Sequence, residues 1–173
     1  MTSRQSAPVV RLALIAAVAG ALMAASPAAA AGPVHTKIED FTLVFPAGLA
    51  CDFPVEWAIT TNGNNQLVFA PRKNGDQVTR QTGTNITTAT NLDTGASVSL
   101  RGGFRLDIVA HADGDLTIEG RGAIISALFP TDVGGPGMFW FRGHLTDQAD
   151  SGFNVTAHAF VGHADDLCAA LSG

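Results

Sequence analysis

The sequence predicts an all-β protein: an antiparallel β-sandwich or flattened barrel of about eight strands, mostly in meander order, with a short C-terminal helix. Three observations predict this class. Apolar residues recur at every second position in a series of short segments, as in half-buried strands. Breaks rich in Gly, Asn and Asp separate these segments at intervals of about 8 to 12 residues. Good helix formers with leading acids close the chain over 165–171.

The N-terminal residues have the composition of a secretory signal peptide, which we assign to residues 1–31. Arg4 and Arg11 supply positive charge, residues 12–25 are apolar, and small residues follow up to Ala31. We predict export by the general secretory route, with cleavage after Ala30 or Ala31. The apolar run is too short to span a bilayer comfortably, so we expect no membrane span in the mature form.

We expect a flexible leader over 32–40 and a single β domain over 41–173. The clearest pattern within that domain is a hairpin over 104–121, in which apolar and polar residues alternate on both sides of a Gly-containing loop at 112–114. The register that follows pairs Leu106 with Gly120, Ile108 with Ile118, and Ala110 with Leu116. It also places Asp107 opposite Glu119 and Arg105 opposite Arg121, and like charges in such positions repel.

The remaining segments are assigned by the same pattern. Residues 53–59 alternate as a strand, residues 62–65 supply turn residues, and residues 67–69 are predicted to return as the partner strand. The Thr-rich stretch 77–90 is β-branched but thinly apolar. Residues 130–137, rich in Gly and Pro, form the longest predicted loop.

The two cysteines, Cys51 and Cys168, are predicted to form a disulfide. The argument is the compartment, because disulfides persist in proteins that leave the reducing cytosol. Two free thiols are one alternative, and a metal site is another, although His163 is the only histidine near either cysteine in sequence. We predict no metal site in this protein.

A second hairpin over 138–145 and 153–161 suggests a candidate interaction patch. If Leu145 stands opposite Phe153, four residues share a face that is otherwise polar: Met138, Trp140, His158 and Phe160. An exposed apolar patch on a soluble protein tends to mark a binding surface. The alternative is that a second sheet or the C-terminal helix covers these side chains.

Charge and motif content exclude several classes of function. The chain has a net charge of −5 and no basic cluster, so nucleic acid is not an expected partner. The glycine-rich, metalloprotease and nucleophile-elbow motifs do not occur in the sequence. We therefore assign no catalytic residue and no cofactor.

Four stretches together resemble a group of small secreted proteins of unknown function from high-GC Gram-positive (actinobacterial) bacteria. They are Cys51 after the export signal, residues 91–95 (Asn-Leu-Asp-Thr-Gly), residues 129–137, and residues 166–171 around Cys168. The resemblance covers most of residues 51–171. It implies an exported β domain with paired cysteines, and it implies no activity.

The function that these observations favour is a secreted, non-enzymatic binding or structural module of unknown ligand, with a cell-surface or protein partner as the expectation. One alternative is a carrier of a small apolar ligand in a barrel interior. Another is a hydrolase that uses two of the acids Asp107, Asp115 and Glu119, since two acids on adjacent strands can lie at the separation that glycoside cleavage needs.

Overall fold

The computed structural model describes residues 32–173, so the predicted signal peptide lies outside the described residues. The elements in chain order are β1 (Val34–Lys37), β2 (Phe41–Phe45), β3 (Val55–Val68), β4 (Gln77–Asn91), β5 (Ser97–Ala110), β6 (Leu116–Leu128), β7 (Gly137–Ala149), β8 (Val155–Asp166) and α2 (Leu167–Leu171).

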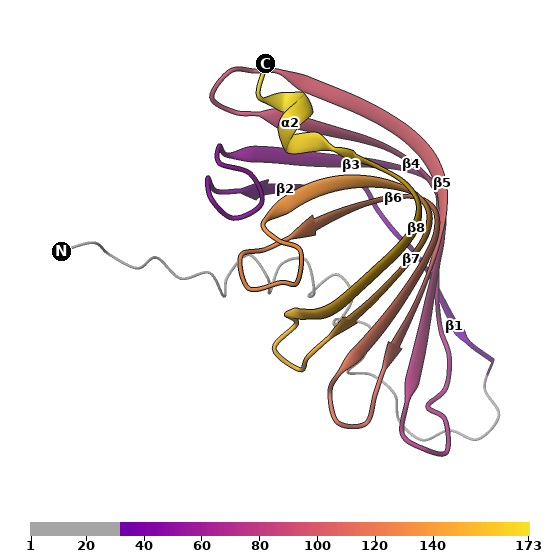
Figure 1. The fold of residues 1–173 in the computed structure, drawn as a ribbon. Coiled ribbons are helices and arrows are strands. Elements are labelled where there is room, and N and C mark those ends of the chain that lie inside the picture. Colours follow the sequence, from indigo (N-terminus) through magenta and orange to yellow (C-terminus); the bar gives the residue numbers. More distant parts are fainter. Residues whose placement is uncertain (1–31) are drawn as a thin grey trace.

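The eight strands form one antiparallel sheet in the order β1-β3-β4-β5-β6-β7-β8. The eighth strand, β2, also pairs with β3, along a different part of it from β1. From β3 onward every strand pairs with the next along the chain, which confirms the predicted meander, and the predicted C-terminal helix is present. The long strands bend together, so the sheet is strongly curved (Figure 1). In the described residues β1 and β8 do not pair, and the sheet is not closed.

The hairpin of β5 and β6 has the predicted register. Leu106 pairs with Gly120 and Ile108 with Ile118, and Asp107 does stand opposite Glu119. The repulsion is offset from β4, because Arg80 is the partner of Asp107 in the β4–β5 ladder and its Nε lies 2.5 Å from Oδ1. Arg105 adds a second ion pair at 2.6 Å. Pairing of distant strands therefore supplies charges that the isolated hairpin lacks.

The turn predicted at residues 62–65 is wrong, because the chain continues through it as one long strand, β3. The ladder with β4 shifts register between Asn62 and Asn65, which is a β-bulge. Gly63 has a φ of +69°, and the side chain of Asn64 packs where a Cβ of Gly83 would otherwise stand. Residues typical of a turn here bend a strand instead.

The leader predicted over 32–40 contains a strand. Residues 34–37 form β1, whose side chains are all exposed and which pairs with the distal half of β3, Val34 with Val68 and Lys37 with Asn65. The sequence pattern did not predict this strand because its residues are mostly polar. An edge strand can form backbone hydrogen bonds without burying its side chains.

A row of glycines crosses the sheet where β6, β7 and β8 bend. Gly122 stands opposite Gly143, which stands opposite Gly162. Gly122 has a φ of +97°, and a Cβ on it would clash with the carbonyl oxygen of Gly103 on β5. A glycine is required here because the left-handed backbone and the close approach both exclude a side chain.

The buried apolar residues form two hydrophobic clusters. The larger joins the N-terminal half of the domain to the helix and includes Phe45, Val55, Trp57, Met138, Leu167 and Leu171. The smaller consists of Ile124, Phe141 and Leu145, with Phe104, Leu106, Phe139 and Phe160 packed against it.

The disulfide and the helix close the larger cluster. The sulfurs of Cys51 and Cys168 lie at bonding distance, 1.94 Å, which joins positions 117 residues apart. Asp166 caps α2 by accepting a hydrogen bond from the backbone N–H of Ala169 at 3.0 Å. Asn91, at the end of β4, donates to the carbonyl of Leu171 at 3.1 Å. Both ends of the domain are thereby tied to one core.

Candidate functional site

The curved sheet lines a partly open cavity of about 800 Å³, which is the candidate functional site. Its walls come from β3, β4, β5, β6 and β7, together with the segment from Thr36 to Leu43. Aliphatic and aromatic side chains dominate the lining, and they include Trp57, Ile59, Leu100, Leu106, Ile118 and Trp140. Both tryptophans of the chain therefore face the same space.

Residues 38–40, which we call the strap, connect β1 to β2 and form part of the cavity wall. The strap is fastened to Thr61 beside the β3 bulge. The carboxylate of Asp40 accepts hydrogen bonds from the Thr61 backbone N–H at 2.7 Å and from its hydroxyl at 2.9 Å. The Thr61 hydroxyl also donates to the carbonyl of Ile38 at 3.1 Å. The backbone hydrogen bond from Thr61, followed by that from its hydroxyl, lowers the pKa of Asp40.

Four carboxamides from β3 and β4 form a polar strip in the cavity wall. Asn64 is hydrogen-bonded to Asn85, and Gln81 donates to Gln66 at 2.8 Å. Each pair satisfies one donor and one acceptor and leaves further amide valences in the wall. The strip carries no charge, so the cavity offers neutral hydrogen-bonding groups on this side.

Asp147 is a buried carboxylate in the lining, on the central strand β7. It is 4% exposed, and its cross-strand partners are Ile118 on one side and His158 on the other. Oδ1 of Asp147 lies 2.7 Å from Nδ1 of His158. Burial raises the pKa of Asp147; the hydrogen bond and charge of His158 oppose that shift, and the negative charge of Asp132 adds to it.

The structure does not gather the predicted interaction patch on one exposed surface. Met138 is 0% exposed in the larger cluster, and Trp140 packs against that same cluster. His158 and Phe160 lie beyond the bend, where Phe160 packs on Phe141 with ring centroids 4.7 Å apart.

The predicted register was the reason for this error. Leu145 pairs with Phe160, whereas Phe153 lies in the turn with a φ of +63°. The turn is held by Asp150, whose carboxylate accepts from the backbone N–H groups of Gly152 and Asn154. The observed register differs from the predicted one by several residues, so the four side chains are not neighbours. Two of them remain relevant, because Trp140 lines the cavity and His158 holds Asp147.

The acids considered for a hydrolase have different surroundings. Burial disfavours the charged form of Asp107, but hydrogen bonds from Arg80 and Arg105 outweigh it, and the pKa of Asp107 is lowered. Glu119 is exposed. A general acid requires a raised pKa. Arg80 and Arg105 instead lower the pKa of Asp107. Neither residue lines the cavity.

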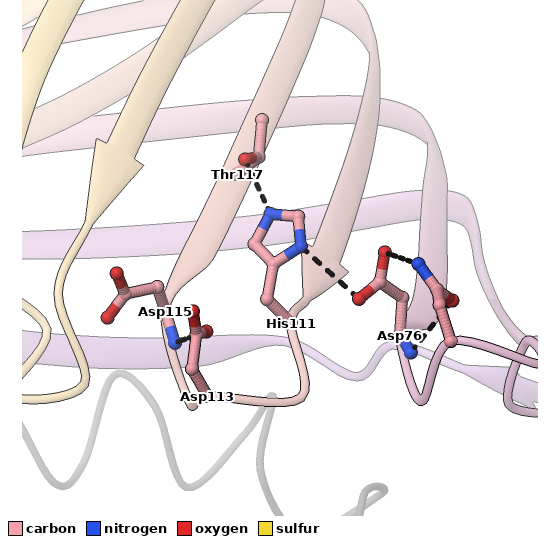
Figure 2. A network of polar contacts seen from close by, with 6 residues as sticks. Asp76, His111, Asp113, Asp115 and Thr117 are labelled. Carbon is pink, nitrogen blue, oxygen red and sulfur yellow. Dashed lines mark hydrogen bonds and ion pairs between the residues drawn. The ribbon is translucent and has the colours of Figure 1, made fainter.

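A polar network lies at the ends of two hairpins (Figure 2). In it a histidine contacts a threonine through one ring nitrogen and an aspartate through the other. Nε2 of His111 lies 2.9 Å from the Thr117 hydroxyl, and Nδ1 lies 3.4 Å from Asp76. A side-chain hydrogen bond from Asn74 is the largest cause of a lowered pKa at Asp76.

This order of groups is the one that activates a hydroxyl in hydrolases. The 3.4 Å contact is too long for a good imidazole–carboxylate hydrogen bond, and neither His111 nor Thr117 lines the cavity. The network instead links the β3–β4 loop to the β5–β6 loop, while Asp113 orders the latter by accepting from the backbone N–H of Asp115 at 3.1 Å.

Among residues 32–173, His, Cys, Asp and Glu side chains form no group of three or more that is arranged to hold a metal ion. Within the same residues the structure has no helix with the length and hydrophobicity needed to cross a bilayer.

The fold and cavity thus define an all-β protein built on one open, curved sheet with an apolar interior. Comparisons with protein-family models, curated proteins and solved structures found no significant match to this chain.

Sequence reasoning missed Asp147 as a site residue. The alternation of β7 places it on the same face as Leu145, Phe141 and Phe139, and a charged residue at an apolar position of a strand is the signal that was available.

Proposed function

We propose that this protein is a non-enzymatic binding protein that holds a small apolar molecule in the cavity. The observation that carries the proposal is the cavity of about 800 Å³ with its mainly apolar lining. Ligand pockets are typically about 300 to 1,000 Å³ and are lined by apolar side chains with a few placed polar groups. This cavity has that size and that composition.

The apolar lining supports an occupant. The cavity is partly open to solvent, so aliphatic and aromatic side chains of its wall meet water. Apolar surface that is removed from water contributes about 25 cal/mol per Å². The bulge in β3 and the glycines on β6, β7 and β8 curve the sheet around this space. A bound molecule would cover that apolar surface.

Intrinsic fluorescence tests the proposal directly, because the chain has two tryptophans and no tyrosine. The probe is a dodecyl chain with bromine at its terminal carbon, since bromine quenches a nearby indole. We expect saturable quenching of the Trp57→Phe variant, in which Trp140 is the reporter. The substitution loses no hydrogen bond, because Nε1 of Trp57 has no partner among the described residues.

Matched variants separate the cavity from the outer surface. Ile118→Phe fills the cavity and should weaken the probe about tenfold or more, because overpacking leaves no room for the chain. Ile86→Phe makes the same change at a residue that is 43% exposed and should leave affinity unchanged. A reporter outside the cavity, with both tryptophans changed to Phe and Val161→Trp, should not be quenched. Equal quenching at the exposed reporter would refute the proposal.

We also propose that the protein acts outside the reducing cytosol after export. The Cys51–Cys168 pair supports this location, since such bonds persist in oxidising compartments. The test is the intact mass of protein recovered from the culture medium of its own host. Export predicts an N-terminus at Ala31 or Gly32, and full-length protein confined to the cytosol would contradict it.

A further inference from the structure

One charged group stands out in the interior of this sheet. Asp147 is 4% exposed, lines the cavity, and has Ile108, Ile118 and Leu145 as apolar lining neighbours from the same end. Ile108 pairs with Ile118, and Ile118 pairs with Asp147, so the three residues form one row across β5, β6 and β7. A carboxylate in such surroundings is unfavourable unless hydrogen-bond donors satisfy its oxygens.

The described residues satisfy the Asp147 carboxylate on one side. Oδ1 is held by His158 at 2.7 Å, and the His158 ring is fixed in turn by Phe141, with centroids 5.4 Å apart. Oδ2 has no hydrogen bond to the protein in the described part of the chain, and it is not one of the fully buried atoms that lack a partner, so it remains accessible. Asp147 therefore offers a free hydrogen-bond acceptor in the cavity wall.

We propose that Asp147 binds the polar head of the ligand and that this head donates a hydrogen bond, as a hydroxyl or a protonated amine does. The proposal rests on the function proposed above and names the ligand class: an amphiphile with an apolar chain and one donor head group. His158 is the positioning residue, because its contact with Oδ1 fixes the carboxylate plane. A carboxylate head is disfavoured at this position, since it would place a second anion beside Asp147.

The placement of the apolar chain follows from the lining. Trp140 and Trp57 lie with the larger hydrophobic cluster, across the bend from Asp147. A chain that starts at Asp147 and runs along the cavity passes Ile118 and Ile125 before it meets the indoles. Bromine on the far carbon of such a chain would therefore quench the tryptophans while the head occupies Asp147.

The test compares three probes that share the terminally brominated dodecyl chain and differ in the head: alcohol, amine and carboxylate. Dissociation constants come from tryptophan quenching of the full protein. We expect the alcohol and the amine to bind about tenfold or more tightly than the carboxylate. If the amine binds more tightly than the alcohol, the natural head is an ammonium group; the reverse order indicates a hydroxyl.

Two variants assign the preference to one residue. Asp147→Asn removes the charge with little change in shape and should bring the amine to within a few-fold of the carboxylate. Asp76→Asn is the matched control, because Asp76 also contacts a histidine, His111 at 3.4 Å, and neither residue lines the cavity. It should leave all three constants unchanged.

The outcomes separate the two proposals. If all three probes bind equally to the unaltered protein, or if Asp147→Asn keeps the original ranking, the head-group inference is wrong and the apolar binding site stands. If no probe quenches either tryptophan, both proposals fail. The ranking in the unaltered protein decides the inference even if the Asp147→Asn variant does not fold.

Discussion

Asp107 and Asp147 are aspartates of the same sheet whose pKa values move in opposite directions. Both are partly or fully buried, and burial alone disfavours their charge. Asp107 meets two guanidinium groups, which hold its pKa down. Asp147 meets one imidazole and a second carboxylate at longer range, so burial prevails. Asp107 is paired with arginines of the sheet, and Asp147 is the group that we propose binds a ligand.

We predict that Asp107→Asn destabilises the protein by about 1 kcal/mol at neutral pH, the upper range for a partly exposed ion pair. Because the folded-state pKa of Asp107 is lowered, its contribution is present above the ordinary value of 3.8 and is lost as pH falls through the folded pKa. Thermal unfolding at several pH values should show the variant and the parent converging in acid.

The control for this prediction is Glu119→Gln. Glu119 is exposed and stands opposite Asp107, so its removal relieves repulsion and should be neutral or slightly stabilising. A loss of stability equal to that of Asp107→Asn would show that the two arginines are not the source of the effect.

The Asp147 carboxylate predicts the opposite pH dependence. A raised folded-state pKa means that the folded protein binds the proton more tightly, so this group costs stability as pH rises from 3.8 through the folded pKa. Relative to the parent, Asp147→Asn should therefore gain in melting temperature over that interval. Differential scanning calorimetry of both proteins at several pH values above 3.8 measures this gain. A constant difference between the two proteins would contradict the assignment.

For individual residues, the sequence predicted which charged side chains face each other within one hairpin, but it did not predict their ion-pair partners on other strands. The facing pairs Asp107–Glu119 and Arg105–Arg121 were predictable, because they follow from alternation within one hairpin. Arg80 was not, because it is 27 residues away and reaches Asp107 only through pairing of β4 with β5.

At the scale of the elements, the bend of the long strands shapes the site. The bulge in β3 and the row of glycines on β6, β7 and β8 let strands of up to 15 residues curve as a group. A β-bulge increases local twist and bends a strand. The curvature turns one face of the sheet into the wall of a cavity (Figure 1).

We predict that Gly122→Ala strongly destabilises the fold. The side chain would require a strained φ of +97° and would clash with the Gly103 carbonyl; each effect costs about 1 to 3 kcal/mol. The matched control is Gly95→Ala, where φ is +77° but no atom lies within 4 Å of the added Cβ. Urea unfolding of both variants separates the clash from the backbone term, and equal losses would contradict the role of the bend.

Elements were predictable where local pattern and long-range pairing agree. The β5–β6 hairpin met that condition, with alternation on both strands and a glycine loop between them. Residues 62–65 did not, since Asn and Gly tolerate a positive φ in a bulge as well as in a turn. The register of β7 and β8 was mistaken because Phe153 extends the apolar alternation into a turn that Asp150 closes.

At the scale of the whole molecule, the cavity could not be predicted from the sequence. Its lining comes from five strands and from residues 36–43, and neighbouring lining residues such as Trp57 and Trp140 are far apart in the chain. The sequence predicted all-β architecture, the meander and the cysteine pair. The choice between sandwich and barrel depended on curvature, and the structure has one bent sheet that does not close.

The disulfide should account for a large part of the global stability. Removal of a crosslink between positions 117 residues apart costs about 4 to 5 kcal/mol in chain-entropy models. We predict that the Cys51→Ser/Cys168→Ser protein unfolds at a markedly lower urea concentration than the parent. A parallel experiment reduces and alkylates the parent, and mass spectrometry verifies two modified thiols. An unchanged midpoint in fully alkylated protein would contradict the prediction.

The position of that crosslink also determines how the chain yields to mechanical load. In a single-molecule pulling experiment with handles at residue 32 and at the C-terminus, tension passes through β1, β2 and the sulfur bridge, and it bypasses β3 to β8. Only the segments outside the loop from Cys51 to Cys168, which include β1 and β2, then extend. When a reductant is introduced under constant force, the tether should lengthen abruptly by roughly 400 Å, the contour of the released loop.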